Sequence, residues 1–357
     1  MRNDPARTRL AALGTLALML GYSVYRGSPT RARRDDAPHE AEAPSDLPRP
    51  GLVAVLKRTF AEIGDDHVML VAAGVTFYAL LALFPALAAF VSVYGLFTDP
   101  ATLQDHLSAL DGVLPGGAIT LIRDQFEMLA SNGSTTLGLA FVIGLGTSLW
   151  SANAGVKAIF EALNIAYEET ESRGFVRLTL VAFSFTLGGL LFIGLALGAL
   201  IVLPVILDAM AFGGTIETLL SVLRWPLLLA VVAVLIALLY RYGPSRQPPA
   251  WRWVSWGSAL AAVLWMVFSA AFSWYAANFG SYDATYGSLG AAIGFMTWIW
   301  ISTIVVITGA ELNSELEHQT AADTTTGPDQ PIGHRGAVMA DSAVGGPDRA
   351  KRRGDGL

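Results

Sequence analysis

The sequence contains no cysteine and few charged residues for its length. Without cysteine, disulfides, thiolate metal sites and thiol catalysis are all excluded. Charged residues make up 15% of the 357 residues and hydrophobic residues 53%, which lies outside the range of soluble globular proteins. The composition therefore indicates a membrane protein.

Long charge-free stretches show how the chain would occupy a membrane. Each approaches or exceeds the ~20 residues that a helix needs to cross the hydrocarbon core. They are residues 68–97, 137–156, 178–207, 225–240, 253–279 and 289–310. Continuous apolar runs contradict the alternating pattern of a membrane barrel. The predicted fold class is all-α, a polytopic membrane helical bundle with six core transmembrane helices.

Lys and Arg are concentrated on one side of this predicted bundle. The segments before the first stretch, between the second and third, and between the fourth and fifth contain Arg49, Lys57, Arg58, Lys157, Arg173, Arg177, Arg241, Arg246 and Arg252. The opposite loops are acidic and contain only Arg123, with Arg224 at a boundary. The positive-inside rule places the first set in the cytoplasm. We therefore predict a multi-pass protein of the bacterial inner (plasma) membrane with a cytoplasmic C-terminus.

The two ends of the chain differ in composition from the membrane domain, which we assign to residues 51–318. Within residues 1–50, an apolar stretch begins at Leu10 and ends at Tyr25, followed by a linker rich in Pro, Ala, Asp and Arg. Arginines after the stretch disfavour a signal peptide, which leaves a short extra span or an interfacial helix. Residues 319–357 are predicted to be a disordered cytoplasmic tail.

Short amphipathic helices are expected beside the spans. In the loop after the first span, residues 102–110 and 118–130 have apolar side chains at helical spacing, and so have residues 51–63 on the cytoplasmic side. Such helices lie on the membrane surface and cover the edge of a bundle. A binding role is not required to explain them.

Several short motifs follow one another over roughly residues 51–318. They are Asp65-Asp66 with Ala72-Ala73-Gly74-Val75-Thr76-Phe77-Tyr78 and Leu83-Phe84-Pro85; Leu149-Trp150-Ser151-Ala152 with Leu163-Asn164-Ile165-Ala166-Tyr167; Leu239-Tyr240-Arg241-Tyr242 with Pro244; Ser281-Tyr282-Asp283-Ala284-Thr285-Tyr286-Gly287-Ser288-Leu289; and Gly309-Ala310-Glu311-Leu312-Asn313. Together these motifs resemble the YihY/BrkB family of bacterial membrane proteins. The resemblance implies a membrane protein. Members have been labelled ribonuclease BN, linked to serum resistance, or proposed to export lipid or lipopolysaccharide precursors.

The residues themselves do not favour an enzyme. Metal-dependent RNA hydrolysis needs clustered His, Asp or Glu ligands, but the five histidines are scattered. The run Asp65-Asp66-His67 is better explained as a solvated helix start capped by Asp. A phosphate-binding loop, a nucleophile elbow and a basic aromatic surface for RNA are also missing from the sequence. We predict no catalytic residues, no metal, no cofactor and no nucleic-acid partner.

Polar residues at membrane depth are the candidate site. Burying them unpaired costs several kcal/mol, so they need partners or a function. The candidates for a polar path or gate are Asn153, Lys157, Glu161, Asn164, Glu311 and Asn313. Lys157 can pair with Glu161 on one helical face, or with Glu311 in a charged gate at the cytoplasmic end. The alternative is that Lys157 extends to the membrane surface and the amides hold helices together.

Three further features have both a structural and a functional interpretation. Pro85 inside the first span predicts a kink, which would be architectural or a hinge. Tyr282, Asp283 and Tyr286 form an external turn that would be structural or would contact a head group or cation. Glycines spaced by four, at 194 and 198 and at 290 and 294, favour close helix packing.

The leading functional hypothesis is a transporter or exporter of lipid or envelope precursors through a polar path in the bundle. Its partners would be the lipid bilayer and a lipid or lipopolysaccharide precursor. Because the chain lacks an ATP-binding motif, transport would be passive, ion-coupled or dependent on another protein. The alternative is a nonenzymatic envelope assembly or scaffold protein, and a ribonuclease is less favoured.

Overall fold

The computed structural model describes residues 41–97, 134–197, 214–279 and 289–344, and the regular elements in these ranges are helices. They are η2 (Pro44–Asp46), α2 (Arg49–Asp65), α3 (Val68–Phe97), α6 (Ser134–Ala166), α7 (Phe175–Leu197), α9 (Gly214–Tyr242), α10 (Trp251–Phe279) and α12 (Leu289–His318). A helix occupies each of the six apolar stretches, the end of the third lying outside the described residues. The all-α prediction is confirmed, as is the short helix expected over residues 51–63.

Only some of these helices are both long enough and apolar enough to cross a membrane. In the described ranges, Phe175–Phe192, Trp251–Tyr275 and Ile293–His318 are long and apolar enough. A fourth candidate joins α2 to Val68–Ala82 of α3 through a 60° bend, and Pro226–Tyr242 is apolar but shorter. Crossing by six helices therefore stays a prediction. The helices expected over residues 102–110 and 118–130 lie outside the described residues.

Side-chain exposure is inverted relative to a soluble protein. Large apolar side chains such as Leu70 and Leu180 are more than half exposed, whereas Asn313 and Glu311 in α12 are buried. An apolar exterior suits contact with lipid tails, and polar groups in such a bundle face its interior. The exposure pattern agrees with a membrane protein.

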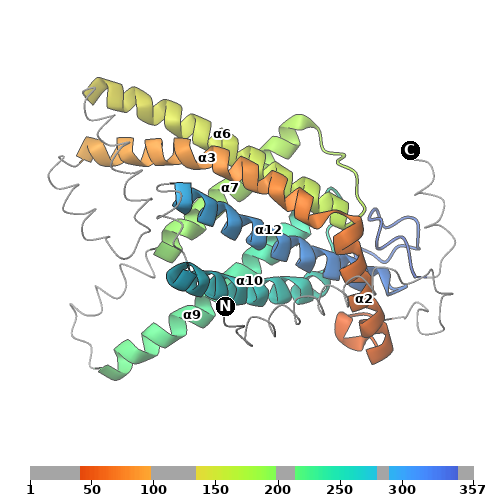
Figure 1. Ribbon diagram of the computed structural model, residues 1–357. Helices are drawn as coiled ribbons and strands as arrows, with labels where there is room; N and C mark the ends of the chain where they lie inside the picture. Colours follow the sequence, from red (N-terminus) through yellow and green to blue (C-terminus); the bar gives the residue numbers. More distant parts are fainter. Residues whose placement is uncertain (1–40, 98–133, 198–213, 280–288, 345–357) are drawn as a thin grey trace, which may run out of the picture.

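The helices pack against one another as a bundle, with α12 joining the α3–α6 pair to the α9–α10 pair (Figure 1). Helix α3 lies along α6, and α12 packs between α3 and α10. Helix α9 packs on α10, whereas α7 packs on α6. The shared core is rich in alanine, including Ala72, Ala162, Ala261 and Ala310. Small side chains let these helices approach closely.

Two glycines bring α10 and α12 into contact. A Cβ atom on Gly309 would lie 2.7 Å from the Gly257 carbonyl oxygen and 2.8 Å from the Ala261 Cβ, and would also meet the Tyr240 hydroxyl. The Gly257 N–H donates a 2.8 Å hydrogen bond to the Asn313 Oδ1. Sequence spacing did not single out this pair. At Gly294, which the spacing did single out, an added Cβ would lie 4.0 Å from the Phe272 ring.

Segments that are far apart in the sequence meet at one end of the bundle. Ser172, after α6, hydrogen-bonds Ser245, after α9, at 2.8 Å. The Gln247 and Ala250 N–H groups donate to carbonyls of the segment that follows α12, at 2.9 and 2.8 Å. These are the segments that charge placement assigns to the cytoplasm. Their gathering agrees with a common side, and the identity of that side stays a prediction.

Residues 319–344, which we call the C-terminal cap, are packed against this end. Arg335 is 7% exposed and donates to the carbonyls of four cap residues, Ala321, Ala322, Gln330 and Ala340. The Thr320 hydroxyl donates a 2.8 Å hydrogen bond to the Ala41 carbonyl. The prediction of disorder is therefore wrong for these residues. Low apolar content misled it, because the cap is held mainly by hydrogen bonds to its backbone.

Candidate functional site

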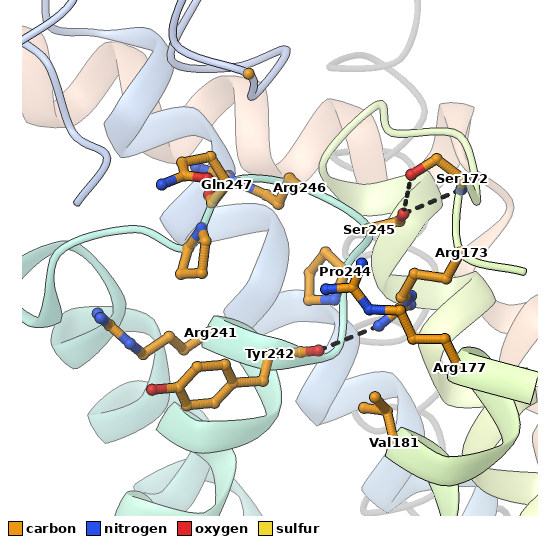
Figure 2. A pocket seen from close by; sticks show the side chains of 12 residues that line it. Ser172, Arg173, Arg177, Val181, Arg241, Tyr242, Pro244, Ser245, Arg246 and Gln247 are labelled. Atoms are coloured by element: carbon orange, nitrogen blue, oxygen red, sulfur yellow. Dashed lines mark hydrogen bonds between the residues drawn. The ribbon is translucent and has the colours of Figure 1, made fainter. Parts of the chain in front are cut away.

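A cavity of about 420 Å³ lies at the end of the bundle covered by the C-terminal cap (Figure 2). We call it the arginine pocket, because Arg173, Arg177, Arg241 and Arg246 all line it. Arg177, Tyr242 and Gln247 in its wall are exposed, so the cavity opens to the surface. The pocket is assembled from the loop after α6, the start of α7, the end of α9 and the loop that follows.

Arg173 is fixed by the short loop between α6 and α7. Its guanidinium binds both Glu171 oxygens, at 2.8 and 2.6 Å, and donates to the Gly243 carbonyl at 2.7 Å. These hydrogen bonds lower the pKa of Glu171 to about 2. The positive φ of Glu168 (55°) turns the chain out of α6 towards this loop. Arg173 thus ties α9 to the loop and is already paired with a carboxylate.

Arg246 is paired inside the protein. Its side chain and that of Glu317 are both 0% exposed, and the two groups meet at 2.6 Å. The guanidinium also lies 4.9 Å above the Tyr167 ring. Burial by itself would lower the pKa of Arg246, but the charge and hydrogen bond of Glu317 raise it above its ordinary value. The pair joins the loop after α9 to the end of α12.

Arg177 and Arg241 have no carboxylate partner among the described residues. Arg241 is held by the Pro249 carbonyl and by the Trp251 ring, 4.6 Å from its guanidinium carbon. Its Nε is buried and has no hydrogen-bond partner. Figure 2 shows Arg177 on the opposite side of the pocket, extending from α7 towards Pro244. With Arg173 and Arg246 neutralised, these two side chains leave the pocket with excess positive charge.

An apolar cavity of about 260 Å³ lies further along the helices, away from the C-terminal cap. Its walls come from five helices and include Ile159, Phe192, Leu239, Trp265 and Val306. Leu239 and Tyr242, which lie one turn apart on α9, line the apolar cavity and the arginine pocket respectively. Helix α7 likewise contributes to both cavities. The two helices therefore connect the basic arginine pocket with the apolar cavity.

The polar residues predicted from sequence lie in different contacts. Lys157 donates to the Thr179 hydroxyl at 2.8 Å, and Asn153 to the Thr179 carbonyl at 3.3 Å. Lys157 does not pair with Glu161, which is exposed, or with Glu311, whose carboxyl group lies close to that of Asp66. A gate made by Lys157 and Glu311 is therefore not formed in this structure.

The two asparagines connect segments. Asn164 accepts a 2.7 Å hydrogen bond from the Ser245 N–H and donates to Glu171 at 3.2 Å. Asn313 accepts from Gly257 and donates to the Val254 carbonyl at 3.3 Å. In both cases the amide joins elements of the bundle. A wider role in a polar path stays a prediction for the whole set.

The other site residues predicted from sequence are the external turn and the proline of the first span. Tyr282, Asp283 and Tyr286 lie outside the described residues. Pro85 lies within α3, and the kink predicted there stays a prediction. The residues missed by the sequence reasoning are the pocket arginines, whose charge had served only to orient the bundle. Within the described ranges, no three His, Asp or Glu side chains are grouped so that they could hold a metal ion.

The chain is similar to one protein family and to several known bacterial proteins. Residues 59–333 match the family described as Virulence factor BrkB, a range that includes part of the C-terminal cap. The ribonuclease-like protein YfkH of Bacillus subtilis is 30% identical over 272 residues, covering 74% of this chain and 95% of YfkH. No solved structure matches the chain significantly.

Two further relatives are named only as membrane proteins. The UPF0761 membrane protein RC1_0578 of Rhodospirillum centenum is 28% identical over 318 residues, covering 86% of this chain and 68% of the relative. A UPF0761 membrane protein of Chromobacterium violaceum is 25% identical over 258 residues, covering 71% of this chain and 59% of that protein. The matched part is thus little more than half of this last relative.

Proposed function

The chain belongs to the Virulence factor BrkB family, whose relatives include membrane proteins, and on that premise we propose that it exports an anionic lipid or envelope precursor across the bacterial inner membrane. The excess positive charge of the arginine pocket carries this proposal. Basic pockets between membrane helices bind the phosphates of lipid head groups. Guanidinium groups suit this role because they donate several hydrogen bonds in one plane.

The adjoining apolar cavity supports an amphipathic ligand over a free anion. A lipid needs a charged site for its head group and an apolar surface for its acyl chains. Helices α7 and α9 supply both, and in the described ranges they make few contacts with each other. A lipid that binds between them would reach both cavities without displacing a packed helix pair. The polar residues of the bundle would then lie beside its path.

The transport proposal predicts charge-selective movement of lipid between leaflets. The full chain in liposomes should move a fluorescently labelled anionic phospholipid faster than a labelled zwitterionic one. Arg177→Glu should slow the anionic lipid about tenfold, which corresponds to ~1.4 kcal/mol. Arg252→Glu is the matched control, because Arg252 is 49% exposed and does not line the pocket.

Other outcomes of the same experiment have defined meanings. Binding of the anionic lipid without movement would favour an envelope assembly or scaffold protein. Equal rates for both lipids in wild type and Arg177→Glu would contradict the proposed site. The name of YfkH makes RNA cleavage a third candidate, but only that name favours it.

The six-span topology predicts which positions are accessible from each side of the membrane. Because the chain has no cysteine, a single introduced cysteine is the only thiol. In intact cells, a membrane-impermeant maleimide should label Asp111→Cys and Asp283→Cys. It should label Ser45→Cys and Ser172→Cys only after the cells are opened. Reversal of either pair would overturn the topology.

A further inference from the structure

A second polar cluster lies where α2 meets α12, away from the arginine pocket. Helix α2 packs across the polar end of α12, and the chain bends by 60° between α2 and α3 (Figure 1). The bend occurs at Asp66 and His67, and His67 has a positive φ of 52°. Its ring is within hydrogen-bond distance of the Gly64 carbonyl, at 3.0 Å. Asp66 is thereby held at the joint between the two helices.

Glu311 is the buried member of this cluster. The residue is 1% exposed, and its carboxyl group lies close to that of Asp66. One carboxyl oxygen of Glu311, Oε1, is buried and accepts no hydrogen bond from an N–H or O–H group of the described residues. Two carboxyl groups can form a hydrogen bond with each other only when one of them carries a proton. The contact therefore requires a proton between Asp66 and Glu311.

Among the residues that the structure describes, acidic side chains surround this proton and the nearest basic ones are bound elsewhere. Glu62 on α2 and Glu315 on α12 add negative charge near Glu311. The guanidinium of Arg58 is engaged by Glu315 and by the Gln319 Oε1, the latter at 2.7 Å. Lys157, on the neighbouring α6, binds Thr179 of α7.

Two further charged or titratable side chains lie nearby. Tyr167 faces Glu311 from the end of α6, and burial raises the pKa of its hydroxyl, so it stays neutral. Arg252 of α10 is exposed and lies 3.9 Å from Glu42. Helix α3 carries no Lys, Arg, Asp or Glu between Val68 and Phe97. In the described part of the neighbouring helices, no Lys or Arg forms an ion pair with Glu311 in place of the proton.

We propose that Asp66 and Glu311 form a proton-binding site that connects α12 to the joint between α2 and α3. Asp66 is partly exposed, which gives the buried carboxyl a route for proton exchange with solvent. Buried acidic pairs of this kind occur in proton relays of transporters. When the proton is present, the pair holds the joint against α12. When the proton leaves, Asp66 and Glu311 are both negatively charged, and their repulsion weakens the contact between the joint and α12.

The site predicts that stability falls as pH rises, which is the sign expected when the folded state holds an extra proton. The melting temperature of the detergent-purified full chain should fall by about 5 °C between about pH 6 and about pH 9. In Glu311→Gln this fall should be absent, since the amide reproduces the neutral carboxyl. Glu161→Gln is the matched control, because Glu161 is exposed on α6, and it should keep the wild-type pH dependence.

A second measurement keeps the test decisive if one variant folds poorly. Infrared spectra of wild type at about pH 7 should contain the C=O stretch of a protonated carboxyl, which Asp66→Asn and Glu311→Gln should each remove. A wild-type spectrum without that band would overturn the proposal. So would stabilisation of wild type, but not Glu311→Gln, by sodium in place of choline at about pH 9, because the ligand would then be a metal cation. Neither result depends on lipid transport.

Discussion

Replacing Glu317 by alanine is expected to destabilise the protein by about 3–5 kcal/mol, because Arg246 would keep its charge in a buried site without a counter-ion. Both side chains of the pair are fully buried. The Thr324 hydroxyl, which donates to Glu317 at 2.8 Å, would lose its acceptor as well. In detergent, the melting temperature followed by size-exclusion fluorescence should fall by roughly 10 °C.

Controls separate the loss of the ion pair from the loss of a side chain. Arg252 and Glu42 lie 3.9 Å apart and are well exposed, so Arg252→Ala should change stability by less than ~1 kcal/mol. The double variant Arg246→Met with Glu317→Leu should recover much of the loss, since apolar residues of similar volume replace buried pairs well. Equal melting temperatures for Glu317→Ala and Arg252→Ala would contradict this account.

Replacing Gly309 by leucine should also cost several kcal/mol, because its side chain would occupy the contact between α10 and α12. Even its Cβ would lie 2.7 Å from the Gly257 carbonyl oxygen, which belongs to the backbone and has little room to move. Overpacking of this kind costs about 1–3 kcal/mol, and more when helices must separate. The yield of monodisperse protein and its melting temperature should both fall.

The matched control for this substitution is Gly188→Leu. Gly188 is also inside a membrane helix, α7, but an added Cβ would meet no atom within 4 Å. Its melting temperature should stay within a few degrees of wild type. Gly309→Ala should give an intermediate loss, and an unchanged melting temperature for Gly309→Leu would show that the two helices can separate freely.

The helices were predictable from sequence because the membrane imposes a simple physical rule. A charge-free run of about 20 residues must be helical to satisfy its backbone in lipid. Val68–Phe97 is both the first predicted apolar stretch and the full extent of α3. Helix ends were less predictable, since α12 continues past Ala310 to His318 through Glu311, Glu315 and Glu317. These charges are tolerated because the ends of other helices surround them.

The arginine pocket was not predictable, because its walls come from segments far apart in the chain. Arg173 and Arg241 contribute to the same positive-inside bias in the sequence, and the bias contains no information on which of them face one cavity. The same limit applies to Asp66. From sequence it is interpreted as part of a solvated helix start; in the structure it is partly exposed and also lies close to Glu311, a residue 245 positions later. Local patterns do not encode such pairings.

The late position of Glu315, Glu317 and Gln319 in the chain has a consequence for how the protein is made. The buried guanidinium of Arg246 is paired with Glu317. Arg58, near the N-terminus of the membrane domain, is paired with Glu315 and Gln319. During synthesis these partners leave the ribosome after the other long helices, because they lie in the last turn of α12 or directly after it. The earlier helices must therefore be inserted with basic groups that are still hydrated. Ribosomes that stop before Glu315 would release a chain in which Arg58 and Arg246 lack these carboxylate partners, and quality-control proteases would recognise it there.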